Sequence, residues 1–199
     1  MYIVVKTRFD KTVGVLAIQG DFERHVYQLG LVGARAVEVR LPQDLEKLDA
    51  LILPGGESTT MNIMIDRFDL KEPLLRFGRS KPVFGTCAGM IMLARKIENN
   101  ISKVQPLGLM DIDVDRNGYG RQVHSFEEQL DAVLAGQKVS LTATFIRAPR
   151  VTRLGSGIET LAAWRNDPVL IKQGRLLAAS FHAELDSDTR LLEYFLTKV

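Results

Sequence analysis

The chain has 199 residues, of which 46% are hydrophobic and 25% are charged, and its formal net charge is +2 at pH 7. This length and composition predict one soluble globular domain with a full hydrophobic core. The nearly balanced charge argues against nucleic acid or a membrane surface as a partner. A single cysteine and the lack of a membrane-length apolar run favour a cytoplasmic protein.

The first half of the chain alternates short apolar runs with segments of helical periodicity. Strands are predicted at residues 13–18, 36–39, 50–53 and 82–84, and the first of them is predicted to be buried on both faces. After the first of them, Phe22, Val26 and Leu29 fall on one helical face. Ser58 or Thr59 is expected to cap the helix that follows the third. This βαβα alternation predicts a parallel sheet covered by helices.

The second half is richer in strand patterns. Aspartates alternate with Met110, Ile112 and Val114, and this alternation indicates a strand with one polar face. The segment is not a calcium-binding loop, because it lacks the glycine and the glutamate that such a loop requires. Further strands are predicted at residues 139–146, 159–164, 169–171 and 176–179. A hairpin turn is predicted at residues 173–174, and an amphipathic helix at residues 188–198.

These elements predict an α/β fold of three layers. The central sheet is expected to be mainly parallel and flanked by helices, with a smaller antiparallel portion. We expect residues 1–12 to form an N-terminal extension and residues 13–199 to form a single domain.

Cys87 lies where the apolar run at residues 82–84 meets an apolar, helix-like stretch at residues 90–94. Its small neighbours, among them Gly85 and Ala88, allow a sharp turn from strand to helix. The start of that helix would direct N–H groups and a partial positive charge at the sulfur, which favours the thiolate. A lone cysteine is more often a small buried apolar residue, but this pattern predicts a nucleophile.

A cysteine nucleophile needs a base, and the sequence contains three histidines. We interpret His25 as a partly exposed residue of the first helix, and His124 has no acidic residue at a useful spacing. His182 follows a predicted strand, and in an extended chain Glu184 shares its face. Glu184 can accept the Nδ1 proton while Nε2 takes the proton of Cys87. Because the carboxyl ends of parallel strands meet at one edge of a sheet, we predict a Cys87, His182 and Glu184 triad.

The glycine-rich turn at residues 54–57 follows another predicted strand. A glycine of this turn, together with the N–H of Ala88, can form an oxyanion hole beside the sulfur. An ordinary tight turn is the alternative interpretation.

Five stretches together resemble a known family. They are LPGGESTTM at residues 53–61, FGTCAG at 84–89, RNGYGRQ at 116–122, FIRAP at 145–149 and FHAEL at 181–185. The chain is similar to the glutaminase subunits of pyridoxal 5'-phosphate synthases, a branch of the class I, triad-type glutamine amidotransferases. The second stretch indicates only the wider class, whereas the first, third and fourth point to this branch. The similarity runs from about Val13 to the C-terminus.

The resemblance implies hydrolysis of L-glutamine to L-glutamate and ammonia. The ammonia would pass to a (β/α)8-barrel synthase subunit in a hetero-oligomer that makes pyridoxal 5'-phosphate, a form of vitamin B6. It also implies attack by Cys87, proton transfer by His182, and an oxyanion hole formed by the N–H groups of Gly56 and Ala88. The residues implied for the glutamine site are Gly56, Glu57, Ser58, Arg116, Ile146 and Arg147.

The sequence contains no zinc-ligand cluster and no phosphate-binding Gly-x-x-x-x-Gly-Lys-Ser/Thr loop. We therefore expect neither a metal nor a cofactor.

Three features depart from the family pattern. Ala183 stands between His182 and Glu184 where the family usually has proline, about ten residues precede the first family strand, and position 118 is glycine. Alanine loosens φ and restores a backbone donor, so we expect retained but slower turnover.

Other functions remain compatible with these residues. A glutaminase subunit for another ammonia acceptor would share the triad but not the first and fourth stretches. A non-catalytic regulatory partner of the synthase is disfavoured by the intact triad, with Ala183 as the only feature in its favour. For a cysteine hydrolase or chaperone-like protein of the wider fold group, we expect no labelling by a glutamine analogue that glutamine protects against.

Overall fold

The computed structural model describes residues 9–119 and 125–199. Within these residues the elements are, in chain order, β1 (Thr12–Leu16), α1 (Phe22–Leu31), β2 (Arg35–Val39), the 3-10 helix η1 (Pro42–Leu45), β3 (Ala50–Leu53), α2 (Ser58–Arg67), α3 (Lys71–Ser80), β4 (Val83–Thr86), α4 (Ala88–Leu93), β5 (Ala94–Glu98), β6 (Met110–Asp115), β7 (Phe126–Leu134), β8 (Gln137–Phe145), β9 (Arg150–Leu154), β10 (Glu159–Trp164), β11 (Asp167–Gln173), β12 (Leu176–Ala179), the 3-10 helix η2 (Ala183–Leu185) and α5 (Arg190–Lys198).

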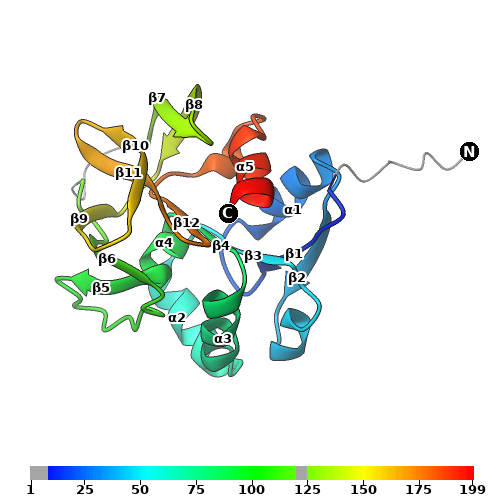
Figure 1. Ribbon diagram of the computed structural model, residues 1–199. Coiled ribbons are helices and arrows are strands. Elements are labelled where there is room, and N and C mark those ends of the chain that lie inside the picture. The colour runs from blue at the N-terminus through cyan, green and yellow to red at the C-terminus, as the bar shows by residue number, and fades with distance from the viewer. Residues whose placement is uncertain (1–8, 120–124) are drawn as a thin grey trace, which may run out of the picture.

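In the described part of the chain the larger sheet has nine strands, in the order β2-β1-β3-β4-β12-β11-β10-β7-β8. The first five strands in this order, from β2 to β12, are parallel to one another. The other four strands, β11, β10, β7 and β8, extend the sheet in antiparallel pairs. The hairpin between β11 and β12 pairs Gln173 with Leu176 at the predicted turn. Figure 1 shows α1 and α5 on one side of the parallel strands and α2 and α3 on the other. This arrangement confirms the predicted three-layer α/β fold.

Alternating side chains of the buried strands fill two separate cores. On β3, Ile52 packs with the residues of α1 and α5, whereas Leu51 and Leu53 pack with those of α2, α3 and α4. All three side chains are at most 1% exposed. Burial of each stabilises the fold by about 1.5–3 kcal/mol relative to an exposed side chain. A run that is apolar at every position is therefore required, because helices cover both faces.

A second sheet of three strands, in the order β5-β6-β9, forms within the described residues beside α4. On β6, Asp113 is 5% exposed and accepts two short hydrogen bonds of 2.7 Å from Arg95. Arg153 donates to the neighbouring carboxylate of Asp111 at 2.9 Å. The alternation predicted for this strand is present, but Asp111 and Asp113 pair with arginines of the adjacent strands.

Two features of the helices were not predicted. The cap of α2 is Glu57, not Ser58 or Thr59, because its longer carboxylate reaches the N–H groups of Thr59 and Thr60. The helix α3 was not predicted at all. Of the helices that the structure describes, none is both long and apolar enough to cross a membrane.

Candidate active site

Cys87 lies at the sharp turn between the end of β4 and the start of α4. Its backbone has φ 48° and ψ −103°, a conformation that costs a residue other than glycine on the order of 1–3 kcal/mol. The neighbouring strand supports this turn, since the N–H of Cys87 donates to the carbonyl of Ala179 at 2.8 Å. The side chain is 6% exposed. The predicted turn from strand to helix is confirmed.

His182 and Glu184 follow β12, the parallel neighbour of β4. His182 Nδ1 lies 2.6 Å from Glu184 Oε1, and the N–H of His182 donates to the carbonyl of Thr144 at 2.9 Å. We expected an extended chain here. Instead His182 caps the 3-10 helix η2 and Glu184 lies inside it, so a helical turn brings the two side chains together.

The charges of these side chains depend on one another. Burial lowers the pKa of His182, but hydrogen bonds to Cys87 and Glu184, and their negative charge, outweigh burial and raise this pKa to about 10. Burial raises the pKa of Glu184, but the electrostatic interaction with His25 and the hydrogen bond from His182 bring it below its ordinary value. The site therefore favours an imidazolium next to a carboxylate at neutral pH.

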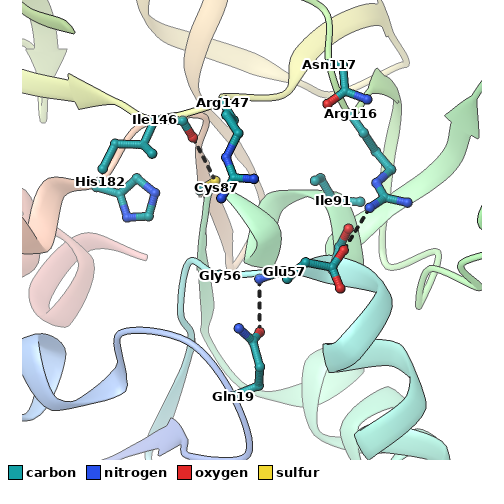
Figure 2. Close-up of a pocket in the computed structure, with 11 residues that line it drawn as sticks. Gln19, Gly56, Glu57, Cys87, Ile91, Arg116, Asn117, Ile146, Arg147 and His182 are labelled. Carbon is teal, nitrogen blue, oxygen red and sulfur yellow. Dashed lines mark hydrogen bonds and ion pairs between the residues drawn. The ribbon is translucent and has the colours of Figure 1, made fainter. Parts of the chain in front are cut away.

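A pocket of about 310 Å³ borders Cys87 and His182. This is the low end of the range for small-molecule sites and suits a ligand of amino-acid size. Figure 2 shows the pocket-facing side chains around the sulfur. The residues that line the pocket are Gln19, Gly56, Glu57, Ser58, Cys87, Ile91, Arg116, Asn117, Ile146, Arg147 and His182. All six residues implied for the glutamine site are therefore in its wall.

Glu57 and Arg116 form one wall of this pocket. Arg116 Nη2 lies 3.0 Å from Glu57 Oε1 and 3.1 Å from Thr59 Oγ1. Burial raises the pKa of Glu57, but hydrogen bonds from the N–H groups of Thr59 and Thr60 lower it to about 2. The carboxylate is thus ionised, and it fixes both the start of α2 and the guanidinium of Arg116.

The segment after β8 forms the opposite wall. Cys87 Sγ lies 3.9 Å from the carbonyl oxygen of Ile146. Arg147 has a φ of 46°, and this turn lets the chain leave the strand beside the sulfur. Figure 2 shows Ile146 and Arg147 next to Cys87 and across the pocket from Glu57.

The glycine-rich turn after β3 completes the floor. A Cβ on Gly55 would collide with the imidazole of His182, so only glycine lets the ring pack on this turn. Gly56 is in the pocket wall, and Ala88 is the first residue of α4. Both residues of the expected oxyanion hole thus lie near Cys87.

Three polar residues at the site were not assigned by the sequence analysis: Gln19, His25 and Asn117. Gln19 lines the pocket, and its Oε1 accepts from the N–H of Glu57 at 3.1 Å. The interpretation of His25 as partly exposed was wrong, since it is 2% exposed. Its position four residues before Leu29, on the apolar face of the helix, is the signal that indicates burial.

Part of one family stretch lies outside the described residues. Arg116 and Asn117 line the pocket, whereas residues 120–122 of the same stretch, and His124, are outside the part of the chain that the structure describes.

Comparisons with known proteins agree on one family. The pattern of the SNO glutamine amidotransferase family matches residues 15–199. A pyridoxal 5'-phosphate synthase subunit PdxT from Pelotomaculum thermopropionicum is 51% identical over 188 residues, which cover 94% of each chain. The subunit of the same name from Geobacillus kaustophilus is 48% identical over 189 residues, again 94% of each chain.

A solved structure described as a glutamine amidotransferase agrees with this fold. It is 46% identical in sequence, has a TM-score of 0.86, and the match covers 92% of this chain and 96% of that one. With a family match over nearly the whole length and relatives at about half identity, the chain belongs to the SNO glutamine amidotransferase family.

Proposed function

We propose that this protein is a glutaminase that hydrolyses L-glutamine to L-glutamate and ammonia and supplies the ammonia to a pyridoxal 5'-phosphate synthase. The observation that carries the proposal is the placement of Cys87, on its strained turn, in one pocket with His182, whose Nδ1 contacts the buried Glu184. Family membership and the names of the relatives support the choice of substrate and pathway.

The first half of the reaction releases ammonia. In the resting pair the thiol proton of Cys87 already lies on Nε2 of His182, whose Nδ1 is engaged by Glu184. The sulfur attacks the side-chain carbonyl carbon of glutamine, and the N–H groups of Gly56 and Ala88 stabilise the resulting oxyanion. When the carbonyl re-forms, the C–N bond breaks, His182 returns its proton to the nitrogen, and ammonia leaves a glutamyl thioester on Cys87.

The second half regenerates the enzyme. Water loses a proton to His182 Nε2 and attacks the thioester carbon. Collapse of this second intermediate breaks the C–S bond, releases L-glutamate and returns the sulfur of Cys87 to its pair with His182. The carboxylate of Glu184 keeps the ring orientation through both halves.

The rest of the pocket suits the α-amino acid end of glutamine. Arg116 and Arg147 provide fixed positive charge for the α-carboxylate. Acceptors for the α-ammonium are available from Glu57, Ser58 and the backbone at Ile146. Because Glu57 and Arg116 already pair with each other at 3.0 Å, they are preorganised to bind a zwitterion.

We infer that the synthase partner is a (β/α)8-barrel subunit, which would receive ammonia within a hetero-oligomer. The relatives are themselves named as subunits of such a synthase, which supports a partner. A cytoplasmic location fits a free nucleophilic thiol, because a reducing compartment keeps it active.

The deciding experiment is glutamate release from L-glutamine by the purified chain, with and without a pyridoxal 5'-phosphate synthase barrel subunit. We expect activity that rises with the partner and is lost in Cys87→Ala. Covalent labelling of Cys87 by 6-diazo-5-oxo-L-norleucine, read by mass spectrometry and prevented by excess L-glutamine, tests the nucleophile without requiring turnover.

Each alternative gives a different result. A folded wild type that releases no glutamate with the partner and is not labelled would contradict the proposal and favour a non-catalytic regulatory protein. Stimulation by the barrel of another ammonia-using synthase, but not by this one, would reassign the pathway. Labelling without protection by glutamine would indicate a different cysteine hydrolase.

A further inference from the structure

His25 lies behind the proposed triad, on the side away from the pocket. It comes from α1, and its Nε2 is 3.5 Å from Glu184 Oε2 and 3.2 Å from Thr86 Oγ1. Thr86 directly precedes Cys87 in the sequence. One imidazole therefore touches both the proposed acid of the triad and the residue before its nucleophile.

The two carboxylate oxygens of Glu184 differ in their hydrogen bonding. Oε1 contacts His182 Nδ1 at 2.6 Å. Oε2 is a buried atom that, among the described residues, makes no hydrogen bond of ordinary length. The side chain of Glu184 is 0% exposed and that of His25 is 2% exposed, so water cannot easily take the place of a protein donor.

The protonation of His25 follows from its surroundings. Burial lowers its pKa, with the charges of Glu184 and Asp21 opposing this and that of His182 adding to it. A neutral imidazole has one N–H and one lone pair. A lone pair on Nε2 could accept from the Thr86 hydroxyl but would also face the lone pairs of the carboxylate, which is repulsive. An Nε2–H would meet both the Thr86 oxygen and the carboxylate oxygen that lacks a donor.

We propose that His25 is a positioning residue whose Nε2–H faces Glu184 Oε2 and holds this carboxylate in the orientation that bonds to His182. The role rests on the proposed glutaminase function, in which Glu184 orients the base. His25 itself lies outside the five family stretches, in α1. His25 would act only through Glu184 and would not touch the substrate.

The first test measures which ring nitrogen of His25 carries the proton, and it does not require the protein to hydrolyse glutamine. In protein labelled with 15N-histidine, nitrogen chemical shifts distinguish protonated from unprotonated ring nitrogens, and a His25→Gln variant assigns the His25 signals. We expect neutral His25 with its proton on Nε2 at pH 7. A proton on Nδ1 alone would overturn the proposal, even if the wild type proved inactive as a glutaminase.

The second test compares two replacements in the complex with the synthase subunit. His25→Gln keeps an N–H near the place of Nε2, whereas His25→Leu keeps bulk and loses the donor. We expect His25→Leu to lower kcat by about 10-fold or more with KM changed less than about twofold, and His25→Gln to stay within about threefold of wild type. Leu29→Ala, a buried change on the same helix, should lower Tm without this loss of kcat.

A double-mutant cycle shows whether His25 acts through the acid. In a Glu184→Gln background, His25→Leu should change kcat by less than about twofold, because the group that it positions is gone. A full additional loss in that background, or equal loss in His25→Gln and His25→Leu, would contradict the positioning role. Loss of wild-type activity itself would instead refute the proposed function, and the nitrogen shifts would still decide the role of His25.

Discussion

Gly55 determines how closely the turn after β3 can approach the imidazole of His182. A methyl group at this position would collide with the ring, and Glu184 holds the ring through Nδ1 at 2.6 Å. We expect Gly55→Ala to lower kcat for glutamine hydrolysis by about 100-fold, because small displacements of a catalytic group cost that much. Gly30→Ala is the control, since Gly30 has open space around it in α1. Equal kcat in both variants would be evidence against this packing.

Ala183 is one of the three features that the sequence analysis expects to depart from the family pattern. It is the first residue of η2, a position that tolerates proline because its N–H needs no helical partner. His182 has ψ 89°, outside the helical region that a following proline disfavours. We expect Ala183→Pro to raise stability by about 0.4–1 kcal/mol and to keep or increase kcat. Thermal unfolding and glutamate release check this, and a less active variant would show that alanine is required.

At the scale of elements, the N-terminus of α2 depends on Glu57. Its carboxylate accepts from the N–H groups of Thr59 and Thr60 at 2.9 and 2.7 Å. Loss of such a cap costs about 1 kcal/mol of stability. Glu57→Ala should therefore lower Tm, and because Arg116 loses its partner, it should also raise KM for glutamine.

The contribution of Glu57 to the stability of the fold should depend on pH. Its pKa is lowered from 4.5 to about 2 by the cap, so the stabilisation is fully present above pH 4.5 and is lost as pH falls towards 2. Glu57→Gln has no charge to lose and serves as the control. We expect the Tm difference between wild type and Glu57→Gln to shrink from pH 6 to pH 3. A difference that is constant over this range would mean that the charge does not stabilise the cap.

The strands of the parallel sheet were predictable because continuous apolar runs identify strands buried on both faces. The helix α3 was not, since Pro73 and Gly78 interrupt its pattern. In the structure Pro73 falls in the first turn, where it is tolerated. Gly78 lies against Leu109, and a Cβ there would collide with that side chain. Local sequence cannot reveal a glycine that tertiary packing selects.

The site was predictable to the extent that its residues follow strands or belong to family stretches. Cys87 and His182 lie at neighbouring strand ends, as expected. The contact of His25 with Glu184 at 3.5 Å depends on how α1 packs across the end of β12. No spacing in the sequence encodes that packing, and the same holds for Gln19 beside Glu57.

At the scale of the whole molecule, a ligand that binds only the folded chain raises its stability. In Cys87→Ala, which cannot turn over substrate, L-glutamine at about 100 times its Kd should stabilise by about 2.7 kcal/mol. For a chain of this size that raises Tm by about 5–10 °C. D-Glutamine is the matched control, since it reverses the placement of the groups that face Arg116 and Glu57. Equal shifts with both enantiomers would contradict a specific glutamine pocket.

The position of β12 in the sheet has a consequence for biosynthesis. β12 is the last strand of the chain, yet it lies between β4 and β11, and it brings His182 and Glu184 to a cysteine made much earlier. While the ribosome is still translating, Cys87 has neither its base nor the strand that supports its turn. A nascent or prematurely terminated chain therefore cannot release ammonia, and the edge of β4 stays open for other chains to pair with. Only complete molecules would consume glutamine in the cell.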